Sequence, residues 1–182
     1  MPKLYLQQLY IPALDLSENP TAAADAPVNP TLFFDLKFVN PTEGHIISCG
    51  DGEVTFFYGS GRSLDVANYT LGGIVLDKGE TAYQRGVVEA RGVPWEGALE
   101  AVSGGSAAVF GVEVAVEVRF GYYWFWYSSK RWLRVGNDVE VGASGRKLQS
   151  EAVRLTSAAN RQSCRRFPAL TFVVSVLLVL VV

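Results

Sequence analysis

The sequence predicts an all-β protein, a sandwich of about seven strands that is followed by a hydrophobic C-terminal tail. Three observations predict it. Short segments alternate apolar and polar residues, turns rich in Gly, Asn and Asp separate them, and the last sixteen residues carry no charge. The chain therefore divides into a sandwich domain at 1–150, a polar spacer at 151–166 and a hydrophobic tail at 167–182.

Composition limits the functions open to the chain. Its 182 residues are 49% hydrophobic and 19% charged, which allows one folded domain and an appendage. A formal net charge of −2 argues against a nucleic-acid partner, because such proteins normally carry a basic face. Two cysteines permit at most one disulfide and no zinc cluster, and a single histidine leaves little material for metal or triad chemistry, so we expect no cofactor.

The strands are placed where apolar and polar residues alternate, because successive side chains of a strand point to opposite faces. Residues 1–16 lack the continuous apolar run and the cleavage site of a secretory signal, and they alternate instead. A Pro- and Ala-rich loop follows at 17–30, where no long helix fits. The predicted strands lie within residues 1–16, 31–40, 53–59, 84–92, 109–120 and 132–141.

The last two strands and one helix complete the prediction. In the strand at 109–120, the alternate residues from Val112 to Phe120 are apolar and share one face. The strand that follows contains Gly136, which predicts a β-bulge. Residues 95–104 are the single candidate for a helix, and the segment is short.

Several short motifs resemble reactive sites, but each has a structural explanation that we favour. The segment GSGRSL at 59–64 lacks the third glycine and the helix of a phosphate loop, so we interpret it as a hairpin turn. Asp51 and Glu53 could form an acid/base pair, yet an Asp-Gly sequence is typical of a turn that opens a strand. His45 is interpreted as an exposed loop residue and Cys49 as a small buried side chain.

Residues 121–132 are unusually aromatic. They contain seven rings: Tyr122, Tyr123, Trp124, Phe125, Trp126, Tyr127 and Trp132. We expect alternate rings to fill the core and the others to cap its end, because aromatic residues are common in strands. Six consecutive rings cannot all point inward, so some should be exposed. The alternative is a membrane-interface belt or a stacking platform for sugar rings, with Lys130 and Arg131 adding positive charge.

One triplet predicts a modification. Asn68-Tyr69-Thr70 is an N-glycosylation sequon. Such a triplet is common by chance, and it has a consequence only in a domain that enters the secretory pathway. In that case we expect Asn68 to carry a glycan.

A family resemblance rests on the order and spacing of five segments. They are residues 29–42, 54–59, 82–86, 116–120 and 128–141. Asn40-Pro41 ends a predicted strand, and Tyr83-Gln84 forms a Tyr-Gln signature. On these segments the chain resembles the plant late embryogenesis abundant group 2 domain, also called the water stress and hypersensitive response domain. It is most similar to the non-race-specific disease resistance and harpin-induced-like membrane proteins of that family, over about residues 4 to 145.

The resemblance implies a fibronectin-III or immunoglobulin-like sandwich without enzymatic activity. The membrane members act in plant defence and stress responses at the plasma membrane, and they usually display the domain outside the cell. Besides the membrane, the resemblance implies a partner, either another protein in defence signalling or the cell wall. These members usually carry a transmembrane helix ahead of the domain, so a segment upstream of this sequence is a further expectation.

The C-terminal tail predicts membrane attachment. As a helix, residues 167–182 would span about 24 Å, which is shorter than the roughly 30 Å hydrocarbon core. A glycosylphosphatidylinositol signal fits better, because it needs small residues at the attachment site, a polar spacer and a hydrophobic tail. Ser157, which is followed by two alanines, is the predicted attachment residue.

The sequence thus predicts a membrane-anchored defence or stress protein at the plasma membrane, and three alternatives stay open. In a tail-anchored protein the domain would face the cytosol, with Arg161, Arg165 and Arg166 on the cytoplasmic side. The domain could instead protect membranes or proteins under stress without a defined partner. A hydrolase that acts on wall sugars through the aromatic segment lacks a credible carboxylate pair.

Overall fold

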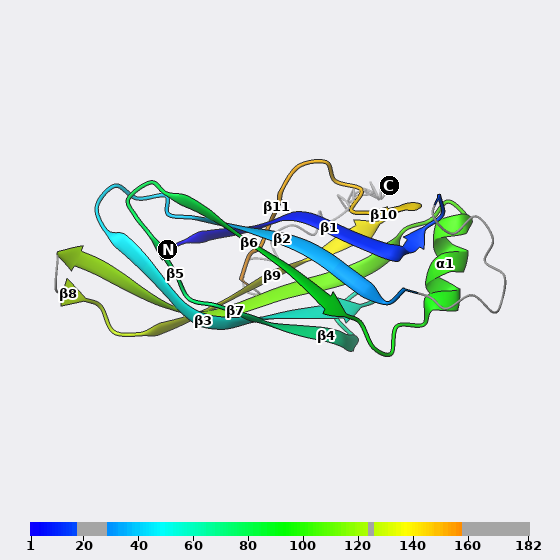
Figure 1. The fold of residues 1–182 in the computed structure, drawn as a ribbon, viewed down its shortest axis with the longest axis horizontal. Helices are drawn as coiled ribbons and strands as arrows, with labels where there is room; N and C mark the ends of the chain where they lie inside the picture. Colours follow the sequence, from blue (N-terminus) through cyan, green and yellow to red (C-terminus); the bar gives the residue numbers. More distant parts are fainter. Residues whose placement is uncertain (18–28, 124–125, 158–182) are drawn as a thin grey trace, which may run out of the picture.

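The computed structural model describes residues 1–17, 29–123 and 126–157. Two antiparallel β-sheets pack face to face, and one short helix lies at an end of the described fold (Figure 1). This confirms the predicted all-β architecture. A fibronectin-III or immunoglobulin-like topology stays a prediction, and the tail at 167–182 lies outside the described residues.

The first sheet is built around the N-terminal strand. β1 pairs with β2 on one side and with β10 and β11 on the other, and β6 pairs with the outer edge of β2. Its strands are β1 (Lys3–Asp15), β2 (Thr31–Val39), β6 (Thr81–Glu89), β10 (Ser144–Arg146) and β11 (Val153–Arg154). β11 lies in the segment predicted as a spacer and pairs with β1. The domain boundaries stay a prediction.

The second sheet is built around β3 and β7. β3 pairs with β4 and β5 on one side and with β7 on the other, and β7 also pairs with β9 and β8. Its strands are β3 (Ile46–Tyr58), β4 (Leu64–Leu71), β5 (Ile74–Leu76), β7 (Ala108–Tyr123), β8 (Trp126–Tyr127) and β9 (Arg131–Val141). A register shift between Cys49 and Gly52 marks a β-bulge in β3. Asp51 therefore lies inside a strand, and the turn predicted there is wrong.

The core lies between the two sheets and follows the alternation seen in the sequence. On β7, Val112, Val114 and Val118 are fully buried. Phe38 of β2 and Phe56 of β3 belong to the same buried cluster. Burying a large apolar side chain contributes about 1.5–3 kcal/mol relative to leaving it exposed, so these contacts hold the sheets together.

α1 (Trp95–Ser103) is the helix expected from residues 95–104. It lies between β6 and β7 in the chain and packs at one end of the sandwich (Figure 1). Its buried residues, Ala98 and Val102, are four positions apart and share one face. Within the described ranges, no helix combines the length and the apolar character that crossing a bilayer requires.

The two long sides of the sandwich differ. On one side, Thr156 exchanges backbone hydrogen bonds with Gly136 of β9, and the amide of Leu155 donates to the carbonyl oxygen of Leu4 in β1. The C-terminal segment therefore joins the two sheets along this side. On the opposite side β6 and β4 are edge strands, and the amide of Arg91 donates to the carbonyl oxygen of Val66 at 2.7 Å.

Two details of the second sheet differ from the prediction. Neither β4 nor β5 was predicted from the sequence. The bulge expected at Gly136 is absent from the β7–β9 pairing, whose register runs unbroken along both strands. A Cβ at Gly136 would lie 2.3 Å from the carbonyl oxygen of Val112, so the glycine permits a close approach of two backbones.

Candidate functional site

Asn40 of the family motif is a buried link between loops. It follows β2, and its side chain is fully buried. Its Nδ2 donates to the carbonyl oxygens of His45 and Asp77, each at 2.9 Å. Its Oδ1 accepts hydrogen bonds from the amide and the hydroxyl of Thr42 at 3.1 and 3.0 Å, which forms an Asx turn. Asn40 thus fastens the β2–β3 loop to the turn between β5 and β6, and its role as a family motif stays a prediction.

The other motif residues differ in their surroundings. Pro41 is exposed in the β2–β3 loop. Tyr83 is 53% exposed on β6 and remains available to a partner. Gln84 is half-buried, and its Nε2 donates to the carbonyl oxygen of Gly72 at 2.8 Å. Gln84 therefore links the first sheet to the β4–β5 connection of the second.

Both predicted modification sites are exposed. Asn68 lies on the edge strand β4, and its Nδ2 is 3.3 Å from a carboxylate oxygen of Asp65. Ser157 directly follows Thr156, whose backbone pairs with Gly136, and is the last residue described. These positions leave both side chains open to modifying enzymes, and the two modifications stay predictions.

The glycine-rich segment at 59–64 forms a hairpin turn between β3 and β4, as predicted. Gly59 and Gly61 have φ values of 88° and 79°, which glycine adopts without steric cost. Arg62 has a φ of 60°, which is uncommon for a residue with a side chain. The observed turn leads directly into a strand, so the segment offers no helix N-terminus to a phosphate.

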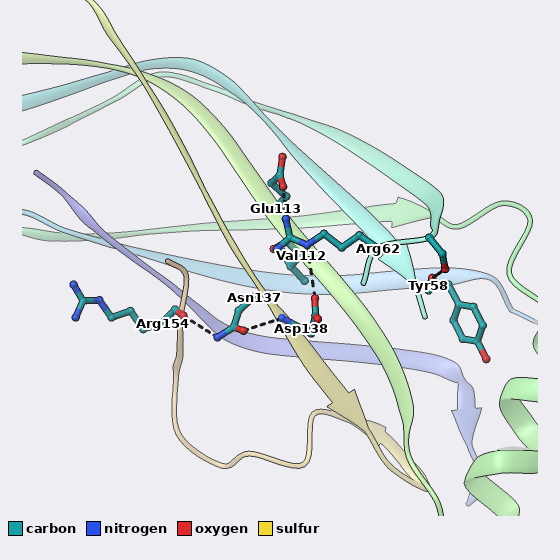
Figure 2. Close-up of polar contacts among 8 residues, drawn as sticks. Tyr58, Arg62, Val112, Glu113, Asn137, Asp138 and Arg154 are labelled. Atoms are coloured by element: carbon teal, nitrogen blue, oxygen red, sulfur yellow. Dashed lines mark hydrogen bonds and ion pairs between the residues drawn. The ribbon is translucent and has the colours of Figure 1, made fainter. Parts of the chain in front are cut away.

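Arg62 reaches from this turn across the outer face of the second sheet (Figure 2). Its guanidinium pairs with Glu113 of β7, and its Nε lies 3.7 Å from Oδ1 of Asp138 in β9. Two glycines make room for the side chain. A Cβ at Gly111 would lie 2.9 Å from the Cγ of Arg62, and one at Gly136 would lie 2.4 Å from its Nη2. Arg62 therefore ties the β3–β4 hairpin to β7 and β9.

The residues considered for reactivity do not converge on a catalytic arrangement in the described structure. Asp51 accepts a hydrogen bond from the amide of Gly73 at 3.1 Å. Cys49 is 2% exposed, and burial raises the pKa of its thiol to about 11, so the thiol stays protonated at neutral pH. The interpretation of Cys49 as a small buried side chain is confirmed. The described ranges contain no group of side chains suited to hold a metal ion.

The aromatic segment does not fill the core. Tyr122 and Tyr127 are 52% and 53% exposed, and Trp126 and Trp132 are each 70% exposed. The expectation that some rings are exposed is confirmed, whereas the expectation that alternate rings fill the core is wrong for these four. The other three side chains of the segment lie outside the description. For Tyr122, Trp126 and Tyr127 the reason is that β7 continues past Phe120, its last buried apolar residue, and pairs there with β8 (Figure 1). Trp132 lies on β9, opposite Glu117 on the outer face of β7.

His45 is half-buried, contrary to the prediction of an exposed loop residue. Its ring centroid lies 5.1 Å from that of Phe120 and 5.4 Å from that of Tyr122. The β2–β3 loop, which Asn40 holds, thus packs against the extension of β7. This end of the sandwich presents the exposed aromatic rings.

A hollow of about 650 Å³ lies on the outer face of the second sheet. It is lined by Asp51, Gly52, Glu53, Ala115, Trp132 and Arg134. Beside it, Glu117 pairs with Lys130 at 2.8 Å and with Arg119 at 3.4 Å. The hydrogen bond from Lys130 lowers the pKa of Glu117 below its ordinary value, against an opposing effect of desolvation. Charges held in pairs around an exposed tryptophan suit a contact surface.

Asp35 in β2 is buried, and this burial was not predicted from the sequence. The backbone register sets it between Gln8 of β1 and Arg85 of β6, and it is only 6% exposed. The one signal in the sequence is a lone carboxylate within the otherwise apolar start of β2. Its surroundings depend on two other strands, which the sequence pattern alone does not identify.

No protein-family model matches the chain. A curated plant protein aligns with its whole length. The chain is similar to Protein NDR1 of Arabidopsis thaliana. The two are 29% identical over 188 aligned residues, which cover 100% of this chain and 80% of the relative. The similarity supports the predicted relationship to NDR1-like proteins, whereas a late embryogenesis abundant group 2 domain is not confirmed.

Proposed function

We propose that this chain is a membrane-anchored, non-enzymatic plant defence protein that binds another protein or the cell wall at the plasma membrane. The observation that carries the proposal is its similarity to Protein NDR1 over the whole chain. The family segments support the finer assignment to the late embryogenesis abundant group 2 domains, since Asn40-Pro41 and Tyr83-Gln84 stand at the expected places in the strand order.

The exposed surface supports a role in binding. Trp126, Tyr127 and Tyr122 project at one end of the sandwich, and Trp132 lies on the outer face of the second sheet. Aromatic side chains are enriched at protein interfaces, because they bury a large area at low entropic cost. A rigid sandwich that holds such rings in solvent therefore suits recognition of a partner.

The C-terminal segment supports a lipid anchor. Ser157 is exposed directly after the last backbone bridge of the sandwich, and the chain after it ends in an uncharged run. Attachment there would hold the β9–β11 side of the sandwich toward the bilayer. Asn68 lies on β4, at the opposite side, where a glycan would face away from the membrane.

Detergent-phase partitioning followed by a phosphatidylinositol-specific phospholipase tests the anchor. We expect the full-length protein to enter the detergent phase before treatment and the aqueous phase after it, because cleavage removes the acyl chains. Retention in the detergent phase after treatment would favour the tail-anchored alternative.

A glycan on Asn68 gives a second readout of the same topology. We expect an endoglycosidase to shift the mobility of the wild-type protein and to leave Asn68→Gln unchanged. Asn137→Gln is the matched control, because Asn137 is not part of a sequon and the shift should persist. Loss of the shift in both variants would mean that folding, rather than the acceptor, was affected.

A further inference from the structure

The outer face of the first sheet carries a hollow that the proposed function leaves unassigned. Its volume is about 650 Å³. Two neighbouring rows of the sheet form most of its lining, with Tyr10, Phe33 and Val87 in one row and Gln8, Asp35 and Arg85 in the other. Phe34, Gly86 and Tyr69 of β4 complete the lining. A register shift between Leu6 and Gln8 lies beside Asp35, and such bulges often re-aim side chains at binding sites.

Asp35, one of the lining residues, has a carboxylate oxygen without a hydrogen-bond partner among the described residues. The side chain is 9% exposed. Oδ2 accepts a hydrogen bond from Nε of Arg85 at 3.1 Å, whereas Oδ1 is buried without a hydrogen-bond partner in the described structure. An unsatisfied buried carboxylate oxygen is costly, because it has lost its water. The hollow is therefore suited to a ligand that brings a hydrogen-bond donor.

Two aromatic rings form the neighbouring wall. The ring centroids of Tyr10 and Phe33 lie 6.1 Å apart, and Phe33 is 40% exposed. The hydroxyl of Tyr10 donates to Oδ2 of Asp15 at 3.1 Å, which fixes the ring. Such rings offer an apolar surface next to polar groups, and the C–H face of a sugar ring is complementary to it.

The charge around the hollow is positive, although the whole chain has a formal net charge of −2. Five basic residues share this outer face: Lys3, Lys37, Arg85, Arg146 and Arg154. Of these, Arg85 is paired with the carboxylate of Asp35. Arg146 lies 5.2 Å above the ring of Tyr10, at the border of the hollow. The acidic Glu89 lies at the far end of β6. A ligand for this face should therefore carry negative charge as well as a hydrogen-bond donor.

From these observations we infer that the hollow binds an acidic polysaccharide, a chain of uronic acids. A sugar ring packs on Tyr10 and Phe33, one of its hydroxyls donates to Oδ1 of Asp35, and its carboxylate pairs with Arg85 or Arg146. The inference rests on the proposed function, because it names the ligand class and the surface of that binding protein.

Other ligand classes match fewer of these features. A neutral glucan leaves the basic residues unused. A basic peptide would meet the positive charge of Arg85 and Arg146. The phosphate diester of an anionic lipid offers acceptors to the arginines, and a donor for Asp35 would have to come from the rest of the headgroup.

Titration of the full-length protein in a non-ionic detergent with a galacturonic acid oligomer tests the inference. The matched ligand is the methyl-esterified oligomer, which keeps the rings and hydroxyls but has no charge. We expect the acidic oligomer to bind at least about tenfold more tightly, because charge-assisted hydrogen bonds to arginine are lost in the ester. Equal affinity, or no binding of either oligomer, would overturn the inference.

A matched pair of arginine variants locates the site. Arg85 is 80% exposed and pairs with Asp35 at 3.1 Å. Arg91 is also exposed, follows β6 and belongs to the lining of neither hollow. We expect Arg85→Ala to weaken binding of the acidic oligomer about tenfold and Arg91→Ala to leave it unchanged. An equal loss in both variants would show attraction to net charge alone and would contradict the site.

Asp35→Asn separates a built site from a charged surface. Asparagine keeps one oxygen for Arg85 and turns its amide toward the hollow, so an acceptor is replaced by a donor. We expect binding to weaken about tenfold. A surface that only attracts anions would instead bind more tightly once a negative charge is removed, and that result would contradict the inference.

A ring variant and a lipid-binding measurement test the site if Asp35→Asn cannot be used. If Asp35→Asn fails to fold, Phe33→Ala removes a partly exposed ring, and unchanged oligomer binding in that variant overturns the stacking arrangement. Binding of anionic lipid vesicles without binding of the oligomer would overturn the ligand class. Release by phospholipase is measured separately from oligomer binding, so failure of the anchor and failure of this site can be distinguished.

Discussion

The side-chain amide of Asn40 donates a hydrogen bond of 2.9 Å to the carbonyl oxygen of Asp77, 37 residues further along the chain. The same amide donates to the carbonyl oxygen of His45, whose ring packs against Tyr122. One buried asparagine therefore holds two connections together at the end of the sandwich that presents exposed aromatic rings. Asn40, directly after β2, thus helps to position the aromatic end of the sandwich, which is formed by segments distant in the sequence.

Replacing Asn40 tests this link. Asn40→Ala removes one hydrogen-bond donor from each of the carbonyl oxygens of His45 and Asp77 and removes the side-chain acceptor of Thr42. We therefore expect a loss of about 2–4 kcal/mol in the free energy of unfolding. Urea denaturation measures it. Glu43→Ala is the control in the same loop, where the side chain is exposed and the change should stay within about 0.5 kcal/mol. Equal stability of the two variants would contradict the role of Asn40.

Gly136 tests the close approach of β9 to β7 and Arg62. In Gly136→Ala the new Cβ would lie 2.3 Å from the carbonyl oxygen of Val112, so backbone must move. We expect a destabilisation of about 2–4 kcal/mol by thermal or urea unfolding. Gly72→Ala is the matched control, because its Cβ would meet nothing within 4 Å. A similar small effect in both variants would show that the β7–β9 contact tolerates a side chain.

Cys49 should be unreactive in the folded protein. In a Cys164→Ser background at about pH 8, we expect a thiol reagent to label Cys49 at least about a hundredfold more slowly than in denaturant. The cause is the pKa of about 11 and the lack of access. Folding raises the pKa of this thiol. The free energy of unfolding is therefore highest at pH values below the thiol pKa of the unfolded state, and it decreases as the pH rises through the thiol pKa of the folded state. Rapid labelling of the native protein would contradict the burial.

Lys130 should control the ionisation of Glu117. Its hydrogen bond lowers the pKa of Glu117, so Lys130→Ala should raise that pKa in an NMR titration of the carboxyl group. A carboxylate with a lowered pKa stabilises the fold above its unfolded pKa, and this contribution is lost as the pH falls through the folded pKa. The variant should therefore differ from wild type near neutral pH and converge with it in acid. Lys78→Ala, in the turn before β6, should leave the titration of Glu117 unchanged.

The strands with one buried face were predictable from the sequence, because burial on one side imposes alternation. β2 and β7 are the clearest examples. β4 escaped prediction, since Val66 and Ala67 are both buried next to a register shift between Phe56 and Phe57. A bulge breaks the period of two that sequence analysis depends on.

The surfaces were less predictable, because they combine residues from several strands. The sequence marks Asp35 as a polar position, but its burial depends on Gln8 and Arg85 across the register. The rings after Phe120 have the composition of a core strand, and their exposure follows from how far β7 extends beyond the core. Neither fact is encoded in a local pattern.

The most direct test of the account is whether the folded domain faces the outside of a plant cell. A membrane-impermeant amine reagent should reach exposed lysines such as Lys130, whose side chain is 57% exposed, when it is applied to intact protoplasts. We predict equal labelling of intact and permeabilised protoplasts. Labelling that appears only after permeabilisation would place the domain in the cytosol and contradict the account.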